Sequence, residues 1–311
     1  MHSVLVVQHG RTLAEWYFRG MDEIRAGADH RVVSFGPDTL HDMRSVTKSI
    51  VSVLFGIAIK ERRIGDLEQP VLDYFPEYRD LATPERRRIT LRHLLTMTSG
   101  LRWDEGPSYK DPRNSETAMD LAADRYRYIL SQPFDSAPGE RWRYSGGDVA
   151  LIAAVVARTT HQPLDQYGRE RLFAPLGISE FVWIKDSHGV PIAASGLRLK
   201  PRDMVKIGLM VLHGGRDAAG NRIVSQKWIS ESTMSHAKAF NAGACVVEYG
   251  YFWWLGPRCE PRWISAIGNG GQRIYLVPQE DLVIVTTAGL YNNPKQNQIN
   301  DVLAAVQDAV G

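Results

Sequence analysis

Four residues in the first third of the chain, Ser45-Val46-Thr47-Lys48, place a hydroxyl and an amine one helical turn apart. They open the stretch 46–60, where apolar residues recur at the spacing of a helix buried on most of its surface. Free backbone N–H groups and the helix dipole at such an N-terminus favour developing negative charge. Because burial disfavours an ammonium group, we expect a lowered pKa for Lys48 and a neutral amine that accepts the Ser45 proton. The spacing therefore indicates a serine nucleophile with a lysine base.

The same four residues also have a purely structural explanation. Serine is a common residue at a helix N-cap, and a second Ser-x-x-Lys spacing occurs from Ser235 to Lys238 in a polar stretch. The motif by itself therefore does not establish catalysis.

A second candidate is Tyr144-Ser145-Gly146, which stands where a loop enters an apolar helix expected at 147–159. A tyrosine in this place can shuttle a proton or can anchor the core. Taken alone, the position favours the anchor.

A third candidate is Gly268-Asn269-Gly270-Gly271-Gln272, between two strand-like segments. Consecutive glycines beside a strand let a substrate or another backbone come close. A backbone N–H there could be the second donor of an oxyanion hole. The structural alternative is a glycine-rich hairpin turn.

The elements that must position these residues are strands at both ends of the chain and helices between them. The patterns predict an α+β fold in which an antiparallel β-sheet, built from both termini and flanked by helices, carries an inserted all-helical lobe. We expect the sheet domain at 1–64 and 190–311 and the helical lobe at 65–189. Expected strands are 3–7, 12–18, 251–255, 263–267, 273–277 and 282–287, with a loop from 18 to about 43, and expected helices are 46–60, 91–97, 115–131, 147–159, 163–172, 204–212 and 297–310.

Composition excludes several classes of function. The 311 residues carry 37 Lys and Arg against 35 Asp and Glu, a net charge of +2 that indicates no nucleic-acid partner. No apolar run is long enough to span a membrane, and the N-terminus lacks the features of an export signal. Phosphate-binding loops, dinucleotide fingerprints and His-Glu-x-x-His are absent. The two cysteines, Cys245 and Cys259, are too few for a zinc site and are expected to be unpaired thiols of a cytoplasmic protein.

The order of the three candidates along the chain resembles the serine β-lactamase and penicillin-recognising enzyme family. The likeness is to its class C-like branch, which includes esterases and aminohexanoate-oligomer hydrolases, and it extends over nearly the whole chain. Three more segments are similar to family signatures: Arg-His-Leu-Leu-Thr-Met-Thr-Ser-Gly-Leu at 92–101, Pro-Gly-x-x-Trp-x-Tyr-Ser at 138–145, and Ala-Ser-Gly-Leu at 194–197 leading to Arg-Asp-Met at 202–204.

The resemblance implies a role for each matching residue. Ser45 would be the acylated nucleophile, Lys48 its general base, and Tyr144 the group that relays a proton to the leaving group and helps to activate the deacylating water. The backbone N–H groups of Ser45 and Gln272 would form the oxyanion hole. The site would lie between the sheet and the helical lobe, take a small-molecule acyl substrate, and need no metal or organic cofactor.

Two positions depart from the family pattern. Gly146 stands where an asparagine is usual, and Asn269 stands where a lysine or histidine is usual, so the charge that pairs with a substrate carboxylate is missing there. Arg273 could supply charge from nearby. Substrate contacts are expected from Trp103, Asp104, Tyr109, Gly146, Asn269, Gly270 and Gly271.

These departures favour hydrolysis of an ester or amide of a small acyl substrate through a Ser45 acyl-enzyme. A β-lactamase or D-stereospecific peptidase is the alternative within the family. A catalytically silent binding protein with the same fold is the alternative outside enzymes, although the retention of Ser45, Lys48 and Tyr144 together argues against it.

Overall fold

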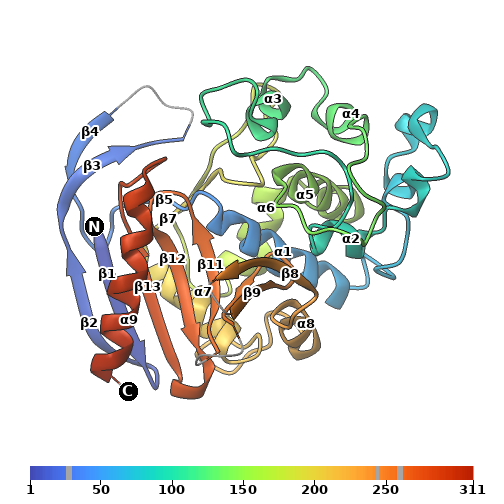
Figure 1. Cartoon of the computed structure of the whole chain (residues 1–311). Coiled ribbons are helices and arrows are strands. Elements are labelled where there is room, and N and C mark those ends of the chain that lie inside the picture. Colours follow the sequence, from blue (N-terminus) through green and yellow to red (C-terminus); the bar gives the residue numbers. More distant parts are fainter. Residues whose placement is uncertain (26–29, 243–244, 258–261, 311) are drawn as a thin grey trace.

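An eight-stranded antiparallel sheet organises the computed structural model, which describes residues 1–25, 30–242, 245–257 and 262–310. Its strand order is β2-β1-β13-β12-β11-β10-β9-β8, so strands from the two ends of the chain pair side by side near one edge of the sheet (Figure 1). The strands are β1 Ser3–Gln8, β2 Arg11–Tyr17, β8 Ala237–Ala242, β9 Cys245–Tyr249, β10 Trp254–Leu255, β11 Ile264–Gly268, β12 Gln272–Val277 and β13 Leu282–Thr287.

Two smaller antiparallel sheets accompany the large one. Strands β3 (Arg19–Glu23) and β4 (His30–Ser34) form a pair, and β5 (His41–Asp42), β7 (Leu197–Leu199) and β6 (Val182–Trp183) form a three-stranded sheet. Strand β5 of the three-stranded sheet ends three residues before Ser45, so this sheet sets the direction from which the chain enters the first helix.

The central strands are apolar on both faces because helices cover both sides of the sheet. Val4 and Val6 of β1 pack in the cluster that contains α9, whereas Leu5 and Val7 pack in the main core. In Figure 1, α9 crosses the outer face of the sheet, and α1 and α7 lie behind it. The α-helices are α1 Val46–Lys60, α2 Leu91–Leu95, α3 Ser115–Leu121, α4 Arg125–Leu130, α5 Gly146–Thr160, α6 Leu164–Gly168, α7 Pro201–Leu212, α8 Gln226–Ser232 and α9 Ile299–Val310.

Helix α1 is the centre of the core. Every residue from Val46 to Ala58 is buried, which confirms the prediction of a helix apolar on most of its surface. Gly56 permits the tight packing of α8, since a Cβ at this position would lie 2.1 Å from the indole of Trp228. The surrounding helices hold α1 in one place, and with it the residues at its N-terminus.

The prediction of an antiparallel α+β fold is confirmed, but several boundaries are wrong. The helix expected at 115–131 is two helices, α3 and α4, because Asp124 caps a new helix by accepting a hydrogen bond from the Arg127 N–H. The loop expected before residue 43 contains β3, β4 and β5. The strand expected at 251–255 is only the two residues of β10, and β8, β9 and α8 were not predicted. β8 is mostly exposed, so it lacks the alternation that marks a half-buried strand.

The division into a sheet domain and a helical lobe stays a prediction. Pairing of β6 with β7 joins the two sides of the expected boundary at residue 190. No helix in the described part of the chain is both long and apolar enough to cross a membrane.

The expectation of unpaired thiols is wrong for Cys245, which is disulfide-bonded. Cys259 lies outside the described residues. Spacing and number of cysteines alone did not predict a bond, because two cysteines do not make a disulfide framework.

Two buried histidines link the N-terminus to β5. His2 Nδ1 lies 2.8 Å from His41 Nε2, and His41 Nδ1 lies 3.0 Å from the main-chain oxygen of Asp42. Burial lowers the pKa of His41 to about 3 and that of His2 to about 4. Both side chains are therefore neutral in the folded protein at neutral pH.

This pair makes the stability of the fold sensitive to acid. Below about pH 6.5 the histidines of the unfolded chain take up protons that the folded chain does not, so the free energy of unfolding should fall as the pH is lowered. The slope for each histidine is at most about 1.4 kcal/mol per pH unit. Urea unfolding at pH 7 and pH 5 measures it, and His41→Phe should lose less stability over this interval than the native chain. An equal loss in both proteins would contradict the assignment.

Candidate active site

Ser45 lies directly before α1, where the chain makes a strained turn. Arg44 has a φ of 48°, a left-handed conformation that side chains other than glycine rarely adopt. Arg44 is held in this conformation by ion pairs to Asp42 at 3.2 Å and to Glu23 at 3.5 Å. The main-chain N–H of Ser45 donates to no acceptor among the described residues. The turn therefore presents the hydroxyl and a free N–H together at a helix N-terminus.

Lys48 lies one turn into α1 with its amine against Ser45. Its Nζ donates to Ser45 Oγ at 3.2 Å and to the Ala194 carbonyl at 3.0 Å. The same Nζ lies 4.9 Å from the ring centre of Tyr144, the residue that precedes the N-cap of α5. The three residues predicted to be catalytic thus meet at one point, brought there by the starts of two buried helices.

Glu116 forms an ion pair with Lys48 that sequence analysis did not predict. Its Oε2 lies 3.6 Å from Lys48 Nζ, and both side chains are only 1% exposed. Its Oε1 accepts hydrogen bonds from Ser195 Oγ at 2.7 Å and from the Arg25 guanidinium at 3.0 Å. Although burial opposes ionisation, Lys48 and Arg25 lower the pKa of Glu116 to about 2.

The expectation of a lowered pKa for Lys48 is wrong. Burial is the largest influence and acts to lower it, but the ionised forms of Tyr144, Glu116 and Glu105 together raise the pKa of Lys48 above its ordinary value. Sequence reasoning considered burial alone and had no means of seeing the carboxylates. Lys48 is therefore an ammonium group in the resting protein. Burial raises the pKa of Tyr144, and the Lys48 charge and the Ser45 hydroxyl act against this increase.

A second carboxylate, Glu105, lies close enough to Tyr144 for its charge to raise the pKa of the phenol. It accepts hydrogen bonds from Trp103 Nε1 at 2.7 Å, from the Gly146 N–H at 2.7 Å and from the Tyr109 hydroxyl at 2.8 Å. Burial, followed by the charge of Glu116, raises the pKa of Glu105. Three donors satisfy the carboxylate in this position.

Gly146 makes room for both carboxylates. A Cβ on this residue would lie 2.6 Å from Glu116 Oε2 and 3.2 Å from Glu105 Oε1. Any larger side chain would therefore displace the partner of Lys48. Where the family pattern has an asparagine side chain at position 146, the Glu116 carboxylate of α3 occupies the neighbouring space in this chain.

Ser45 opens into two adjoining cavities, of about 650 Å³ and about 420 Å³. Ser45, Tyr109, Asn269 and Asn292 line both of them. The larger is also lined by Glu105, Tyr144, Trp254, Ile267, Gly268, Arg273, Gln296 and Asn297, and the smaller by Arg25, Arg44, Glu116, Asp120 and Ser195, among others.

Of the residues expected to contact substrate, the structure places Tyr109 and Asn269 on these cavities. Trp103 is buried beneath Glu105 and is only 1% exposed. Asp104 shapes its own loop by accepting from the Gly106 N–H. Neither of these residues, nor Gly146, lines either cavity.

Gly270 and Gly271 serve the turn between β11 and β12. Their φ angles are 96° and 101°, and a Cβ on either would meet Tyr291 or Ile299. They line neither cavity, so the structural explanation, a glycine-rich turn, describes them better than substrate contact.

Gln272, the expected second oxyanion donor, is fully buried and lines neither cavity. Its side-chain amide bonds to both the N–H and the carbonyl of Ala288, which fixes the start of β12. Asn269, by contrast, lines both cavities, and its main-chain N–H donates to no acceptor among the described residues.

Glu105, Glu116 and Arg25 are the site residues that sequence reasoning missed. Trp103, Asp104 and Tyr109 are expected to contact substrate, so Glu105 had a positional signal between them. Glu116 and Arg25 had none, because each comes from a segment distant in sequence from Ser45.

Comparisons with known proteins identify the family of the chain. A family model described as Beta-lactamase matches residues 2–308. The chain is 30% identical over 302 residues to a 6-aminohexanoate-dimer hydrolase of Paenarthrobacter ureafaciens, covering 91% of this chain and 71% of that protein. It is 32% identical over 184 residues to esterase EstB of Burkholderia gladioli, covering 57% of this chain and 45% of that protein.

A solved structure supports the fold independently. The octameric penicillin-binding protein homologue from Pyrococcus abyssi superimposes with a TM-score of 0.74 at 17% identity, over 99% of this chain and 73% of that one. Because the family model spans nearly all of the chain, the chain belongs to the beta-lactamase family and is a hydrolase of the serine β-lactamase type, similar to carboxylesterases and amide hydrolases.

Proposed function

We propose that this protein hydrolyses an ester or amide of a small acyl substrate through an acyl-enzyme on Ser45. The observation that carries the proposal is the contact between Ser45 Oγ and Lys48 Nζ, at 3.2 Å, in a cavity that Tyr144 also lines. The names of the relatives support the class of bond, and the volume of the cleft suits a small substrate.

The proton of Ser45 passes to the pair formed by Tyr144 and Lys48. Each member favours the ionised form of the other, so the pair with one proton removed is an ammonium beside a phenolate. Tyr144 Oη takes the Ser45 proton while Oγ bonds to the acyl carbon, and then gives the proton to the departing oxygen or nitrogen. In deacylation Tyr144 takes a proton from water while the water oxygen bonds to the acyl carbon. The proton then passes to Ser45 Oγ as its bond to that carbon breaks and the acid leaves.

The oxyanion of the tetrahedral intermediate is held by main-chain N–H groups. Ser45 supplies one, at the N-terminus of α1, and Asn269 supplies the second in place of the expected Gln272. Support comes from the lack of an acceptor for either N–H among the described residues and from their position on the same cavities. Two such donors stabilise charge that develops only in the transition state.

Two finer parts of the interpretation stay predictions. A small-molecule acyl substrate as the partner is suggested by the cleft alone. The cytoplasmic location stays a prediction. Free thiols no longer support it, because Cys245 is disulfide-bonded and disulfides are rare in the reducing cytosol.

Replacing the nucleophile tests the proposal directly. Ser45→Ala should abolish hydrolysis of a short-chain para-nitrophenyl ester, and intact-mass spectrometry should find an acyl adduct on the native chain but none on the variant. Loss of the hydroxyl removes the only bond through which the acyl group is held. Hydrolysis at the native rate by the variant would mean that another residue is the nucleophile.

Tyr144→Phe should lower kcat by about 100-fold or more, because the ring stays in place while the proton-carrying oxygen is removed. Stopped-flow acylation and deacylation rates measure the two steps separately. Thermal unfolding checks that the ring packing is retained. An effect below about threefold on both steps would leave Tyr144 as a packing residue.

The Glu116 carboxylate should control the pH at which the pair loses its first proton. Glu116→Gln removes a negative charge from beside Lys48 and Tyr144, which lowers the pKa of both groups. The acidic limb of the kcat/KM profile should therefore move to lower pH by about one unit.

Two companion variants make this measurement specific. Glu116→Asp retains the charge and should keep the profile near that of the native chain. Glu180→Gln removes one negative charge at an exposed residue paired with Lys200 and should leave the profile unchanged. An unshifted profile in an active Glu116→Gln protein would show that Glu116 only supports the fold.

A further inference from the structure

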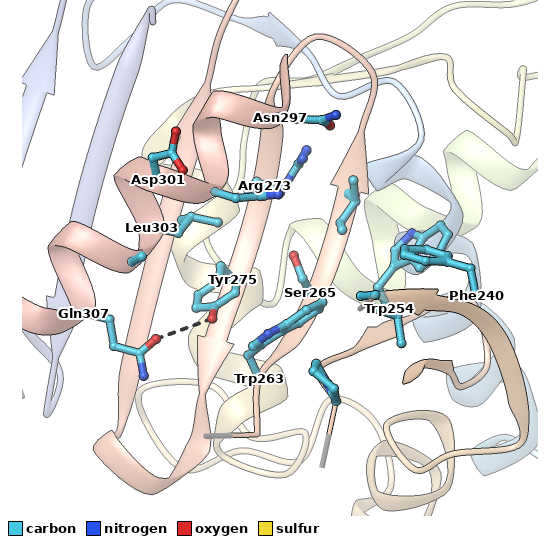
Figure 2. Close-up of a pocket in the computed structure, with 16 residues that line it drawn as sticks. Phe240, Trp254, Trp263, Ser265, Arg273, Tyr275, Asn297, Asp301, Leu303 and Gln307 are labelled. Carbon is cyan, nitrogen blue, oxygen red and sulfur yellow. Dashed lines mark hydrogen bonds between the residues drawn. The ribbon is translucent and has the colours of Figure 1, made fainter. Parts of the chain in front are cut away.

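A cavity of about 640 Å³ lies on the outer face of the sheet, between α9 and the paired strands β8 and β9. Its floor consists of side chains of β11 and β12 that face away from the main core, with Ser265 opposite Tyr275 in register. Figure 2 shows Leu303 of α9 on one side of this floor and Trp254 on the other. This space is called the outer cavity below.

The outer cavity adjoins the catalytic cleft. The residues that line both it and the 650 Å³ cavity containing Ser45 are Trp254, Ile267, Arg273 and Asn297. The Trp254 ring stacks on that of Tyr144, with ring centres 5.6 Å apart, and lies 6.0 Å from the ring centre of Phe240 on β8. Aromatic surface therefore extends from Tyr144, beside the nucleophile, to the outer cavity.

Large apolar side chains around the outer cavity remain partly exposed. Phe240 is 51% exposed, and Trp254 and Trp263 are only partly buried. Trp263 packs on Tyr275 with ring centres 5.6 Å apart, so the rings form a continuous wall above the floor. A concave space lined mainly by apolar and aromatic side chains is typical of a small-molecule site, and a ligand that covers such surface gains from the hydrophobic effect.

Polar groups of the outer cavity are either bonded within the chain or lie at its edges. Tyr275 Oη donates to Gln307 Oε1 at 3.4 Å, Gln307 Nε2 donates to Glu280 Oε1 at 2.9 Å, and Ser265 Oγ donates to the Ala266 carbonyl at 3.4 Å. The other polar residues that line it stand at the exposed rim or at the edge shared with the cleft: Asn297, Asn300, Asp301 and Arg273. The interior therefore suits an alkyl group rather than a polar one.

We propose that the outer cavity is a subsite for an extended alkyl arm of the substrate, so that the enzyme prefers esters or amides with a long alkyl arm over short ones. This rests on the proposed function, since it names the substrate class of the same cleft. The arm leaves the cleft along Trp254 and lies on the floor between Trp263 and Leu303. Because each buried methylene favours binding by about fourfold, a chain of several methylenes gives a large preference.

The alkyl arm can belong to the acyl part or to the leaving group, and matched substrates separate these sources. For the acyl part, para-nitrophenyl octanoate is compared with para-nitrophenyl butyrate. For the leaving group, para-hexylphenyl acetate is compared with para-methylphenyl acetate. Within each pair the reactivity of the ester bond is nearly the same. The native enzyme should have a kcat/KM about 10-fold or more higher for the longer member of at least one pair.

Filling the outer cavity should remove this preference. Ala304 is exposed on α9 and lines the outer cavity but neither cavity at Ser45. Ala304→Trp should lower the kcat/KM for the longer substrate about 10-fold while changing that for the shorter one less than about threefold, because the indole takes the place of the arm. Phe240→Ala removes a ring from the wall and should lower the preference about threefold.

Ala305→Trp is the matched control. Ala305 is the next residue of α9, is also exposed, and does not line the outer cavity, so this variant should keep the native preference. Thermal unfolding checks that the variants remain folded. Calorimetry on the Ser45→Ala protein gives a readout without catalysis: it should detect octan-1-ol, and adding Ala304→Trp should abolish this binding.

Three outcomes would overturn the proposal. They are a native enzyme without preference in either pair, an Ala304→Trp enzyme that keeps the preference, and a native dimer that Ala304→Trp dissociates without any effect on chain length, which would mean that a second copy covers this face. Hydrolysis that persists in Ser45→Ala would instead count against the proposed nucleophile, so the two failures are distinguishable.

Discussion

The buried ion pair between Lys48 and Glu116 joins charges 3.6 Å apart in a place where water scarcely reaches either. A pair of this kind is tolerated only when further hydrogen bonds satisfy both groups. Ser45 and the Ala194 carbonyl do so for the amine, and Ser195 and Arg25 do so for the carboxylate. The nucleophile, helix α3 and the segment at 194–195 are therefore fixed relative to one another by one electrostatic requirement.

That requirement also explains why Gly146 and Glu105 belong to the site. The carboxylate of Glu116 occupies space that a side chain at 146 would fill, and the Gly146 N–H is held by Glu105. Glu105 in turn orients Tyr109 at the cleft wall. The charges of Glu105 and Glu116 raise the pKa of both Lys48 and Tyr144, so a change at either carboxylate is expected to alter their protonation.

Among the described residues, the cleft combines paired charges near Ser45 with a buried charge farther along that has no ion-pair partner. Arg25, Arg44 and Lys48 each have a carboxylate partner, whereas Arg273 has only carbonyl oxygens. Sheet geometry sets this distribution. Arg273 shares the outer face of β12 with Tyr275, and the alternate residues Ile274 and Leu276 point into the inner core.

The sequence alone determined the local parts of this protein. Helical periodicity located α1 to the residue, strand patterns located β1, β12 and β13, and the order of Ser45, Lys48 and Tyr144 indicated the catalytic chemistry. Only the tertiary structure decided the electrostatics, because Tyr144, Glu116 and Glu105 reach the site from separate segments and reverse the expected direction of the Lys48 pKa. It also decided which residue of the glycine-rich turn faces the cleft. Asn269 lines the cavities, whereas Gln272, three residues later, is buried at the start of β12. Local periodicity is a property of neighbouring residues, whereas desolvation and charge depend on what the whole chain brings within a few ångströms.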